Sequence, residues 1–241
     1  MTYPSKHRFA IEFYFSNKKV IDSAKYQAHA VLMYLQKRSR LITEPMEISE
    51  KLVISENTLI VRFAAVLVGI NKNIILRFKI KLQQPQSTGY RGQVRTHVDG
   101  NVVIETMFTA SVTGLTILVE QELQNYVEGI LNEHSFLYDF LIPLQKRYPT
   151  KIIRAHYAGV RSDLRCGVDF VVQYHPPDSL HAMEVRFNLK SSSVYIEKHK
   201  KRYPSVSTFI YRRNYLYDQK RLTRTFFGFL KDACTFSVAH C

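Results

Sequence analysis

The chain has 241 residues, of which 46% are hydrophobic and 22% are charged, and this composition excludes a disordered protein. Its longest uninterrupted apolar run, from Phe63 to Ile70, is far shorter than the ~20 residues that a transmembrane helix needs. With a formal net charge of +14, the chain is expected to bind a polyanion.

The cysteines and the amino terminus predict where the protein resides. The three cysteines are odd in number and scattered, which indicates neither a disulfide framework nor a zinc site. The first residues carry no apolar core of a signal peptide. We therefore expect a cytoplasmic protein without a membrane partner.

The amino-terminal part of the chain predicts a small α+β domain over residues 1–112. Segments in which apolar residues alternate with polar ones, or follow one another, predict strands, and apolar residues spaced three to four positions apart predict a helix. Asp99-Gly100 predicts a hairpin turn. The expected elements are a strand at 8–16, a helix at 23–38, and strands at 58–67, 73–82 and 101–109. This domain is expected to supply DNA recognition or dimerisation, and a homodimer is one possible assembly; the alternative is a plain scaffold.

Residues 113–241 predict a second domain with a mixed central sheet flanked by helices, so that the whole chain is of the α+β or α/β class. Helical spacing runs through the segments 118–131 and 134–147, although Pro143 should kink or divide the second of these. The expected later elements are strands at 151–158, 167–174 and 183–192, a helix at 193–202, and a strand at 207–211. The apolar tail 225–241 is expected to pack on the core.

Two strands of this second domain carry the strongest functional signal. Alternation places Asp169 opposite Val168 and Phe170, and it places Asn188 and Lys190 on one face about 6.7 Å apart. A carboxylate and an amide oxygen are ligands that Mg²⁺ accepts, and a lysine positions a phosphate or an attacking water. The alternative is that Asp169 and Lys190 form an ordinary cross-strand ion pair.

At these residues the chain resembles the PD-(D/E)xK nuclease superfamily, whose hairpin carries an Asp and then (D/E)xK. The expected order of helix, three strands, helix and strand is also that of the family's restriction-endonuclease-like core. The resemblance implies Mg²⁺ or Mn²⁺ as cofactor and Asp169, Asn188 and Lys190 in the catalytic site. It also implies a Glu on the first core helix, for which Glu133 is the choice. Asn188 stands where the family has an acid, so Glu197 on the following helix is a further candidate ligand.

Basic residues gather after this hairpin. From Lys190 to Arg224 there are ten Lys or Arg residues and two acids, and a second basic block runs from Lys72 to Arg95. Segregated charge of this kind favours contact with nucleic acid, with Arg and Tyr tracking the backbone and stacking on bases. The resemblance to nucleases implies that this nucleic acid is double-stranded DNA. The residues expected to bind it are Ser191, Ser192, Lys198, Lys200, Lys201, Arg202, Arg212 and Arg213. The alternatives are an acidic protein partner, an anionic membrane, or a basic face that is only solvated.

The sequence thus predicts a metal-dependent DNA endonuclease that hydrolyses phosphodiester bonds. Two alternatives stay open: a catalytically inactive nucleic-acid-binding protein of the same fold, and a basic structural or assembly protein in a nucleoprotein particle. The residues alone determine neither whether the nucleic acid is DNA or RNA nor which target sequence is bound.

Overall fold

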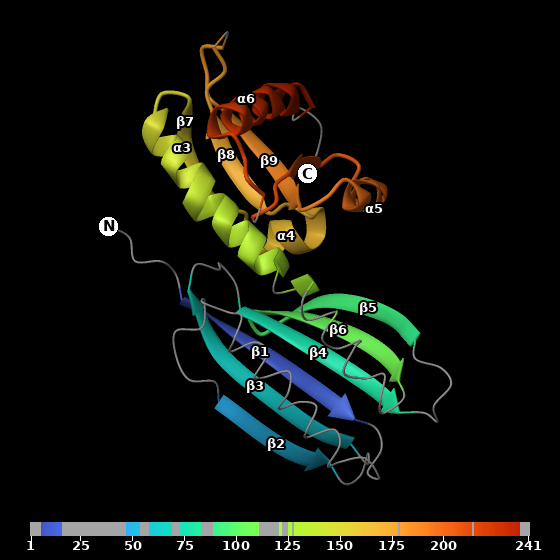
Figure 1. Cartoon of the computed structure of the whole chain (residues 1–241). Coiled ribbons are helices and arrows are strands. Elements are labelled where there is room, and N and C mark those ends of the chain that lie inside the picture. The colour runs from blue at the N-terminus through green and yellow to red at the C-terminus, as the bar shows by residue number, and fades with distance from the viewer. Residues whose placement is uncertain are drawn as a thin grey trace. The chain divides into compact units, whose positions relative to one another are not determined.

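The chain is a mixed α+β protein that forms two compact units, Met1–Val127 and Glu128–Cys241, each described by itself (Figure 1). The computed structural model describes residues 6–15, 47–53, 58–68, 73–82, 89–110, 121, 125–126, 128–177, 179–213 and 215–236. The predicted domain boundary after residue 112 falls within the first unit. No helix in these described ranges is long and apolar enough to cross a membrane.

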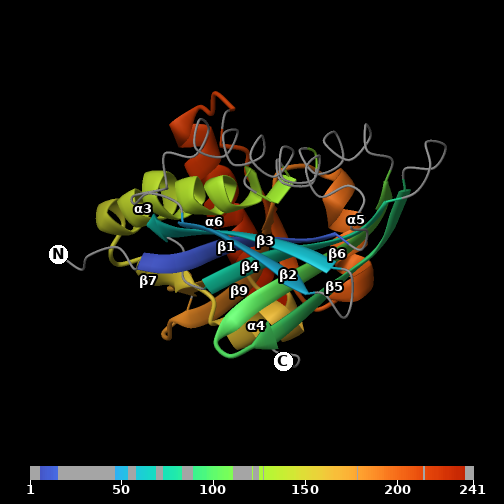
Figure 2. The ribbon, with the colours of Figure 1, turned by 90° about the horizontal axis from the view of Figure 1, so that it is seen from below.

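Unit 1 contains a six-stranded mixed sheet with the order β2-β3-β1-β4-β6-β5 (Figure 2). The β1–β4 and β4–β6 pairs are parallel, whereas β1–β3, β2–β3 and β5–β6 are antiparallel. The strands are β1 (Lys6–Phe15), β2 (Glu47–Val53), β3 (Thr58–Val68), β4 (Asn73–Leu82), β5 (Gly89–Val98) and β6 (Asn101–Ala110).

Strict alternation explains the central strands of this sheet. In β1, Phe9, Ile11 and Phe13 are buried on one face, and the Phe13 ring stacks on Phe78 of β4 at 5.5 Å between centroids. Glu12 points to the other face, where Arg77 contacts its carboxylate at 2.9 Å. The predicted strands at 8–16, 58–67, 73–82 and 101–109 are confirmed, because their apolar residues repeat every second position.

The predicted hairpin at Asp99-Gly100 is also confirmed. Asp99 and Gly100 have positive φ angles of 48° and 77°, and Val98 pairs with Asn101 across the turn. Neither β2 nor the span of β5 was predicted, because almost every described side chain of these two edge strands is exposed and no alternation marks them. The helix predicted at 23–38 lies outside the described residues.

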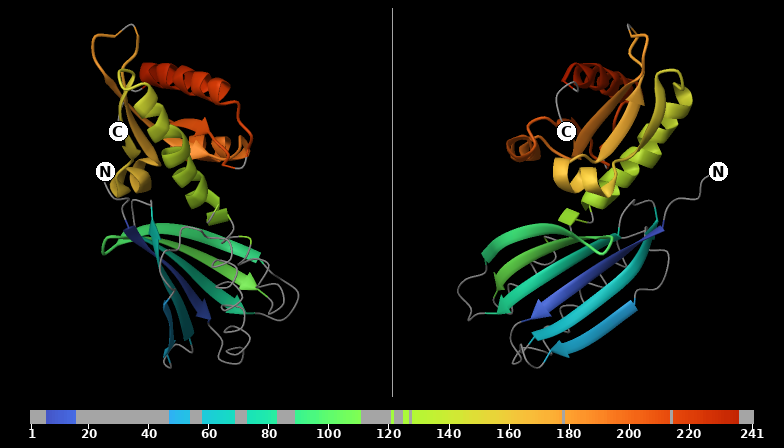
Figure 3. Two further views of the ribbon diagram at one scale, coloured as in Figure 1. Left: turned by 60° about the vertical axis from the view of Figure 1, so that its left-hand side comes forward. Right: turned by 180° about the vertical axis from the view of Figure 1, so that it is seen from behind.

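Unit 2 contains a four-stranded mixed sheet with the order β10-β9-β8-β7, in which β9 and β10 run parallel (Figure 3). The predicted helix, three strands, helix and strand occur in that order, but an additional helix, α4, lies between the first and second strands. The elements are η3 (Phe136–Leu141), α3 (Ile142–Arg147), β7 (Ile152–Tyr157), α4 (Val160–Cys166), β8 (Phe170–Tyr174), β9 (Met183–Lys190), α5 (Val194–Arg202), β10 (Ser207–Ile210) and α6 (Gln219–Phe236).

The first helix of unit 2 changes its type along its length. Residues 128–135 are α-helical, η3 is a π-helical segment, and α3 resumes the α-helix with Pro143 in its first turn. Proline has no N–H to donate to the carbonyl of residue i−4, so the change of type just before Pro143 is in keeping with the predicted disturbance.

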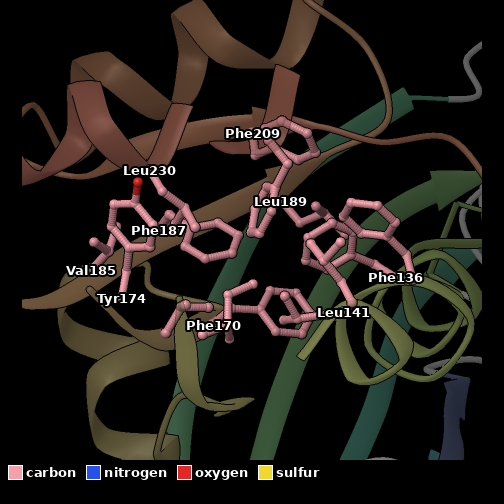
Figure 4. Packing of buried hydrophobic residues seen from close by; sticks show 14 of the residues in the cluster. Phe136, Leu141, Phe170, Tyr174, Val185, Phe187, Leu189, Phe209 and Leu230 are labelled. Atoms are coloured by element: carbon pink, nitrogen blue, oxygen red, sulfur yellow. The ribbon is translucent and has the colours of Figure 1, made fainter. Parts of the chain in front are cut away.

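Aromatic side chains fill the main core of unit 2 (Figure 4). The Phe136 ring lies 5.1 Å from Phe170 of β8 and 6.0 Å from Phe187 of β9. Phe226 and Leu230 of α6 are fully buried in the same core, which confirms that the apolar tail packs on the core as far as Cys234. The substitution Phe187→Ala would remove a side chain that has no exposed surface, and it would lower the free energy of unfolding by about 3–5 kcal/mol.

The short helix α4 was not predicted, and it shifts the start of β8. Gly167 ends α4 in the left-handed region at φ +68°, so β8 begins at Phe170 rather than at residue 167. An added Cβ at Gly167 would lie 2.4 Å from a ring carbon of Tyr203. Val168 packs in a second, smaller core with Val171, not with Phe170 as the alternation predicted. The prediction was wrong because alternation begins only where the strand does.

Candidate functional site

Asp169 lies half-buried between Gly167 and the start of β8, where it is held on both sides by strand-like backbone bonds. Its N–H donates to the carbonyl of Phe187 at 3.0 Å, and its carbonyl accepts from the N–H of Ala158 at 2.8 Å. Its carboxylate Oδ2 accepts the N–H of Leu189 at 2.8 Å. The residue is therefore fixed between Ala158 and β9 by two backbone hydrogen bonds and one to its carboxylate.

Asn188 braces this carboxylate from β9. Its amide nitrogen donates to Oδ2 of Asp169 at 2.7 Å and to the carbonyl of Gly167 at 3.0 Å. Because both partners are acceptors, they determine which end of the amide is the nitrogen. Asn188 is only 3% exposed, and its Oδ1 is buried without a hydrogen-bond partner among the described residues. In this arrangement the amide nitrogen, not the oxygen, is the atom that faces Asp169.

Lys190 is half-buried on β9, two residues after Asn188. Its positive charge acts on His199 of α5. Burial lowers the pKa of His199, and Lys190 lowers it further, whereas the hydrogen bond that the imidazole donates to the Gly167 carbonyl and the charge of Asp169 raise it. The imidazole therefore lies within electrostatic reach of both Lys190 and Asp169. Its Nε2 lies 3.1 Å from the Gly167 carbonyl and its Nδ1 lies 3.4 Å from Oγ1 of Thr208.

Glu133 lies on the helical segment before η3, and Tyr157 at the end of β7 connects it to Asp169. Burial raises the pKa of the Tyr157 hydroxyl, and the negative charges of Glu133 and Asp169 raise it further. The hydroxyl is buried with no hydrogen-bond partner in the described part of the chain. The two acids thus act on one buried phenol, which places Glu133 and Asp169 in the same neighbourhood.

Asp169 and Lys190 therefore lie at one end of the sheet of unit 2, where β8 starts and β9 ends. The charge of Glu133 acts on Tyr157, which ends β7 beside Phe170. Glu197 lies exposed in the first turn of α5, and nothing described connects it to Asp169. Within the described residues, no group of three His, Cys, Asp or Glu side chains is arranged to hold a metal ion. Asp169 and Glu133 are the oxygen donors that an ion at this place would use, and Mg²⁺ or Mn²⁺ takes its remaining ligands from water.

The cations predicted to bind nucleic acid are mostly exposed on α5. Lys198, Lys200, Lys201 and Arg202 all face solvent, and the Arg202 guanidinium lies over the Tyr203 ring at 5.4 Å. Ser191 is exposed and Ser192 half-buried just before this helix. Ser193 occupies the N-cap position, although its side chain makes no capping hydrogen bond.

The two arginines after β10 differ in their surroundings. Arg212 is exposed, whereas Arg213 is half-buried and pairs with Glu128 at 3.3 Å. Part of the basic block of unit 1 is also paired, since Arg77 contacts Glu12 at 2.9 Å and Lys79 contacts Glu105 at 2.9 Å. The exposed cations of α5 are therefore better placed to meet a polyanion than these paired ones.

Sequence reasoning did not assign roles to Gly167, Tyr157 and His199. Gly167 was visible only as the first residue of Gly-Val-Asp, a tripeptide with little meaning by itself. His199 is an isolated histidine in the sequence, and the structure shows that it is buried on α5. Only the fold shows that Asn188 and His199 both bond to the Gly167 carbonyl.

The chain was also compared with known proteins. It matches no protein-family model, and neither the curated proteins nor the solved structures contain a significant match.

Proposed function

We propose that unit 2 is a metal-dependent nuclease domain that binds DNA and hydrolyses its phosphodiester bonds. One observation carries the proposal: the carboxylate of Asp169 accepts hydrogen bonds from Asn188 and Leu189, the two residues that precede Lys190 on β9. Glu133 supplies the second acid in this proposal, because its charge and that of Asp169 both raise the pKa of the buried Tyr157. A pair of acids beside a lysine is the constellation that phosphodiester hydrolysis with a divalent ion requires. The order of elements supports a restriction-endonuclease-like core.

The residues present fit a divalent ion that needs few protein ligands. Asp169 uses Oδ2 for its hydrogen bonds to Asn188 and Leu189, and its second carboxylate oxygen remains for an ion, with Glu133 as the other donor. An ion bound there would activate water and neutralise charge on the phosphate. Because Asn188 offers its nitrogen to Asp169, it orients the acid and adds no negative charge.

The remaining roles belong to the protein's own side chains. Lys190 positions the scissile phosphate at the end of β9. The exposed cations of α5 hold the flanking backbone, because each neutralised phosphate releases counterions and strengthens binding. Such contacts position the duplex without reading its sequence.

A specific observation favours a second candidate, a nuclease-fold domain that binds DNA without cutting it. The position of the family's second acid is occupied by Asn188, whose amide oxygen is buried. With one acid fewer, the site holds a divalent ion less strongly, and an inactive domain would keep the cations of α5 for binding.

Incubation of the purified chain with supercoiled plasmid, with and without Mg²⁺ or Mn²⁺, separates the two candidates. The nuclease proposal expects nicked and linear products only with metal, and it expects their loss in Asp169→Asn. Glu184→Gln is the matched control, since Glu184 is an exposed acid on β9 that pairs with Arg186. Binding of the plasmid without cleavage under any metal condition would support the second candidate.

A further inference from the structure

The turn between β10 and α6 exposes two neighbouring apolar side chains. This Tyr215 turn comprises the described residues 211–213 and 215–218. Leu216 is 97% exposed and Tyr215 is 62% exposed. A single exposed apolar side chain is ordinary, but two adjacent large ones at the tip of one turn require an explanation.

The turn is held in place by a chain of aromatic rings that begins in the core. Tyr211 is buried against Phe136 with ring centroids 5.2 Å apart, and Tyr217 stacks on Tyr211 at 5.5 Å and 11°. Tyr215 meets Tyr217 edge to face at 4.9 Å. The Tyr217 hydroxyl also accepts the N–H of Arg212 at 2.8 Å. Tyr215 therefore projects from a stack anchored in the core.

The helix that carries Glu133 fastens the same turn through Asn132. The buried amide of Asn132 donates to the carbonyl of Tyr211 at 2.8 Å and accepts the N–H of Arg213 at 2.8 Å. Ser135 adds a hydrogen bond to the Tyr211 hydroxyl at 3.0 Å. Because these bonds already order the turn, the protein loses little conformational entropy when a ligand stacks on it.

The charges around the turn are almost all positive. Arg212 is exposed beside it, and so are Lys220, Arg221 and Arg224 in the first turns of α6. Two described acids contact this region, and both are used internally: Asp218 Oδ1 accepts the N–H groups of Lys220 and Arg221 at 2.8 and 3.2 Å, and Glu128 pairs with Arg213 at 3.3 Å. Apolar side chains within a ring of cations complement a ligand that offers flat apolar faces and negative charge, and nucleic acid bases on a phosphate backbone do so.

The turn starts next to Lys190. Ile210 pairs with Lys190 in the parallel β9–β10 ladder, and the N–H of Tyr211 donates to the Lys190 carbonyl at 2.9 Å. Adjacent strands lie about 4.8 Å apart, so the turn leaves the sheet beside the proposed catalytic lysine.

We infer that the Tyr215 turn is a base-stacking wedge and that the preferred substrate is DNA with unstacked bases near the cut, such as a bulge or a junction of single and double strands. This inference rests on the proposed function for the place of cleavage but not for the binding itself. Tyr215 stacks on a base, and Leu216 fills the space that an unstacked base leaves. An intact duplex offers neither surface, so it would be bound through its phosphates alone.

The test measures binding of the full chain, in EDTA to prevent cleavage, to a fluorescent duplex and to the same duplex with one unpaired nucleotide. The parent protein should bind the bulged duplex about 5- to 150-fold more tightly, the range expected for one base–aromatic stack. The double variant Tyr215→Ala with Leu216→Ala should lose this preference and keep its affinity for the intact duplex. Leu180→Ala is the control, because Leu180 is equally exposed, at 93%, between β8 and β9.

The outcomes distinguish this inference from the proposed function. Equal affinity of the parent for both duplexes, or an equal loss for both in the double variant, would overturn the wedge. A preference for bulged DNA without metal-dependent cleavage would uphold the wedge and refute the nuclease. A parent that binds neither duplex, but whose self-association changes in the double variant, would overturn the wedge and identify the turn as a protein contact.

Discussion

The amide nitrogen of Asn188 lies 2.7 Å from the Oδ2 atom of Asp169, and this hydrogen bond determines how the acid is held. With the N–H of Leu189 on the same oxygen, the carboxylate is braced from β9 by two donors. Asn188, which stands where the resembled family has an acid, thus has a structural role, because it orients Asp169. The first two predictions follow from this contact.

Asp169→Asn and Asp169→Ala should differ in stability. Asparagine keeps an oxygen that accepts from Asn188 and Leu189, whereas alanine leaves the Leu189 N–H without that partner. An unsatisfied buried donor costs about 1–3 kcal/mol, so we expect the alanine variant to be less stable by that amount. Urea unfolding gives the two free energies of unfolding. Equal values in both variants would show that these hydrogen bonds do not hold β9 to Asp169.

Asn188→Asp should make the stability of the protein depend on a divalent ion. The change places two carboxylates at the separation now bridged by an N–H, and like charges this close cannot both ionise without a cation. We expect the melting temperature of the variant to fall in EDTA and to rise with Mg²⁺ or Mn²⁺ by more than that of the parent. Salt of matched ionic strength is the control. A variant that is insensitive to both ions would argue against a metal site at Asp169.

The unfolding free energy should fall as the pH drops below about 6.5, the ordinary pKa of histidine, in part because of His199. Burial lowers the pKa of His199 in the folded state, so below that pH the unfolded chain takes up more protons than the folded one. The loss should be complete once the pH is below the folded-state pKa. His199→Gln should flatten this part of the pH profile, whereas His181→Gln, at an exposed position, should leave it unchanged. A profile that is unaltered in His199→Gln would contradict the prediction.

Neutralising Lys200, Lys201 and Arg202 together should weaken the binding of all duplexes alike. Each phosphate contact contributes about 0.9 to the slope of log K against log salt, so we expect the slope to shrink by roughly three. The matched control neutralises Lys146, Arg147 and Lys151, three exposed cations elsewhere in unit 2. If both triple variants bind with the same salt dependence, the surface of α5 is not where the duplex lies.

Much of the fold follows from short-range patterns in the sequence. Strands such as β4 and β9 have one buried face, and their alternation is visible without the structure, as is the turn at Asp99-Gly100. Edge strands such as β2 leave no such pattern, because both of their faces meet water. The helix α4 is too short for a periodic signal, and it hid the true start of β8.

The candidate site was harder to predict than the elements that carry it. The spacing of residues in the sequence brought Asp169, Asn188 and Lys190 together. It could not predict which end of the Asn188 amide faces Asp169, because the hydrogen-bond partners determine this orientation. The grouping of Tyr157 with Glu133 depends on packing between β7 and a helix, which no local pattern reports. Whether the grouping cuts DNA stays a prediction.

The carbonyl of Gly167 is a single backbone oxygen on which a strand and a helix converge. Asn188 reaches it from β9 and His199 reaches it from α5, while the Tyr203 ring leaves no room for a side chain above it. In a mutational scan of binding and cleavage, substitutions at Gly167 would therefore lower both activities as strongly as substitutions of the proposed catalytic residues. Its intolerance to substitution would reflect the missing volume and the left-handed φ of +68°, and it would not indicate a part in the reaction.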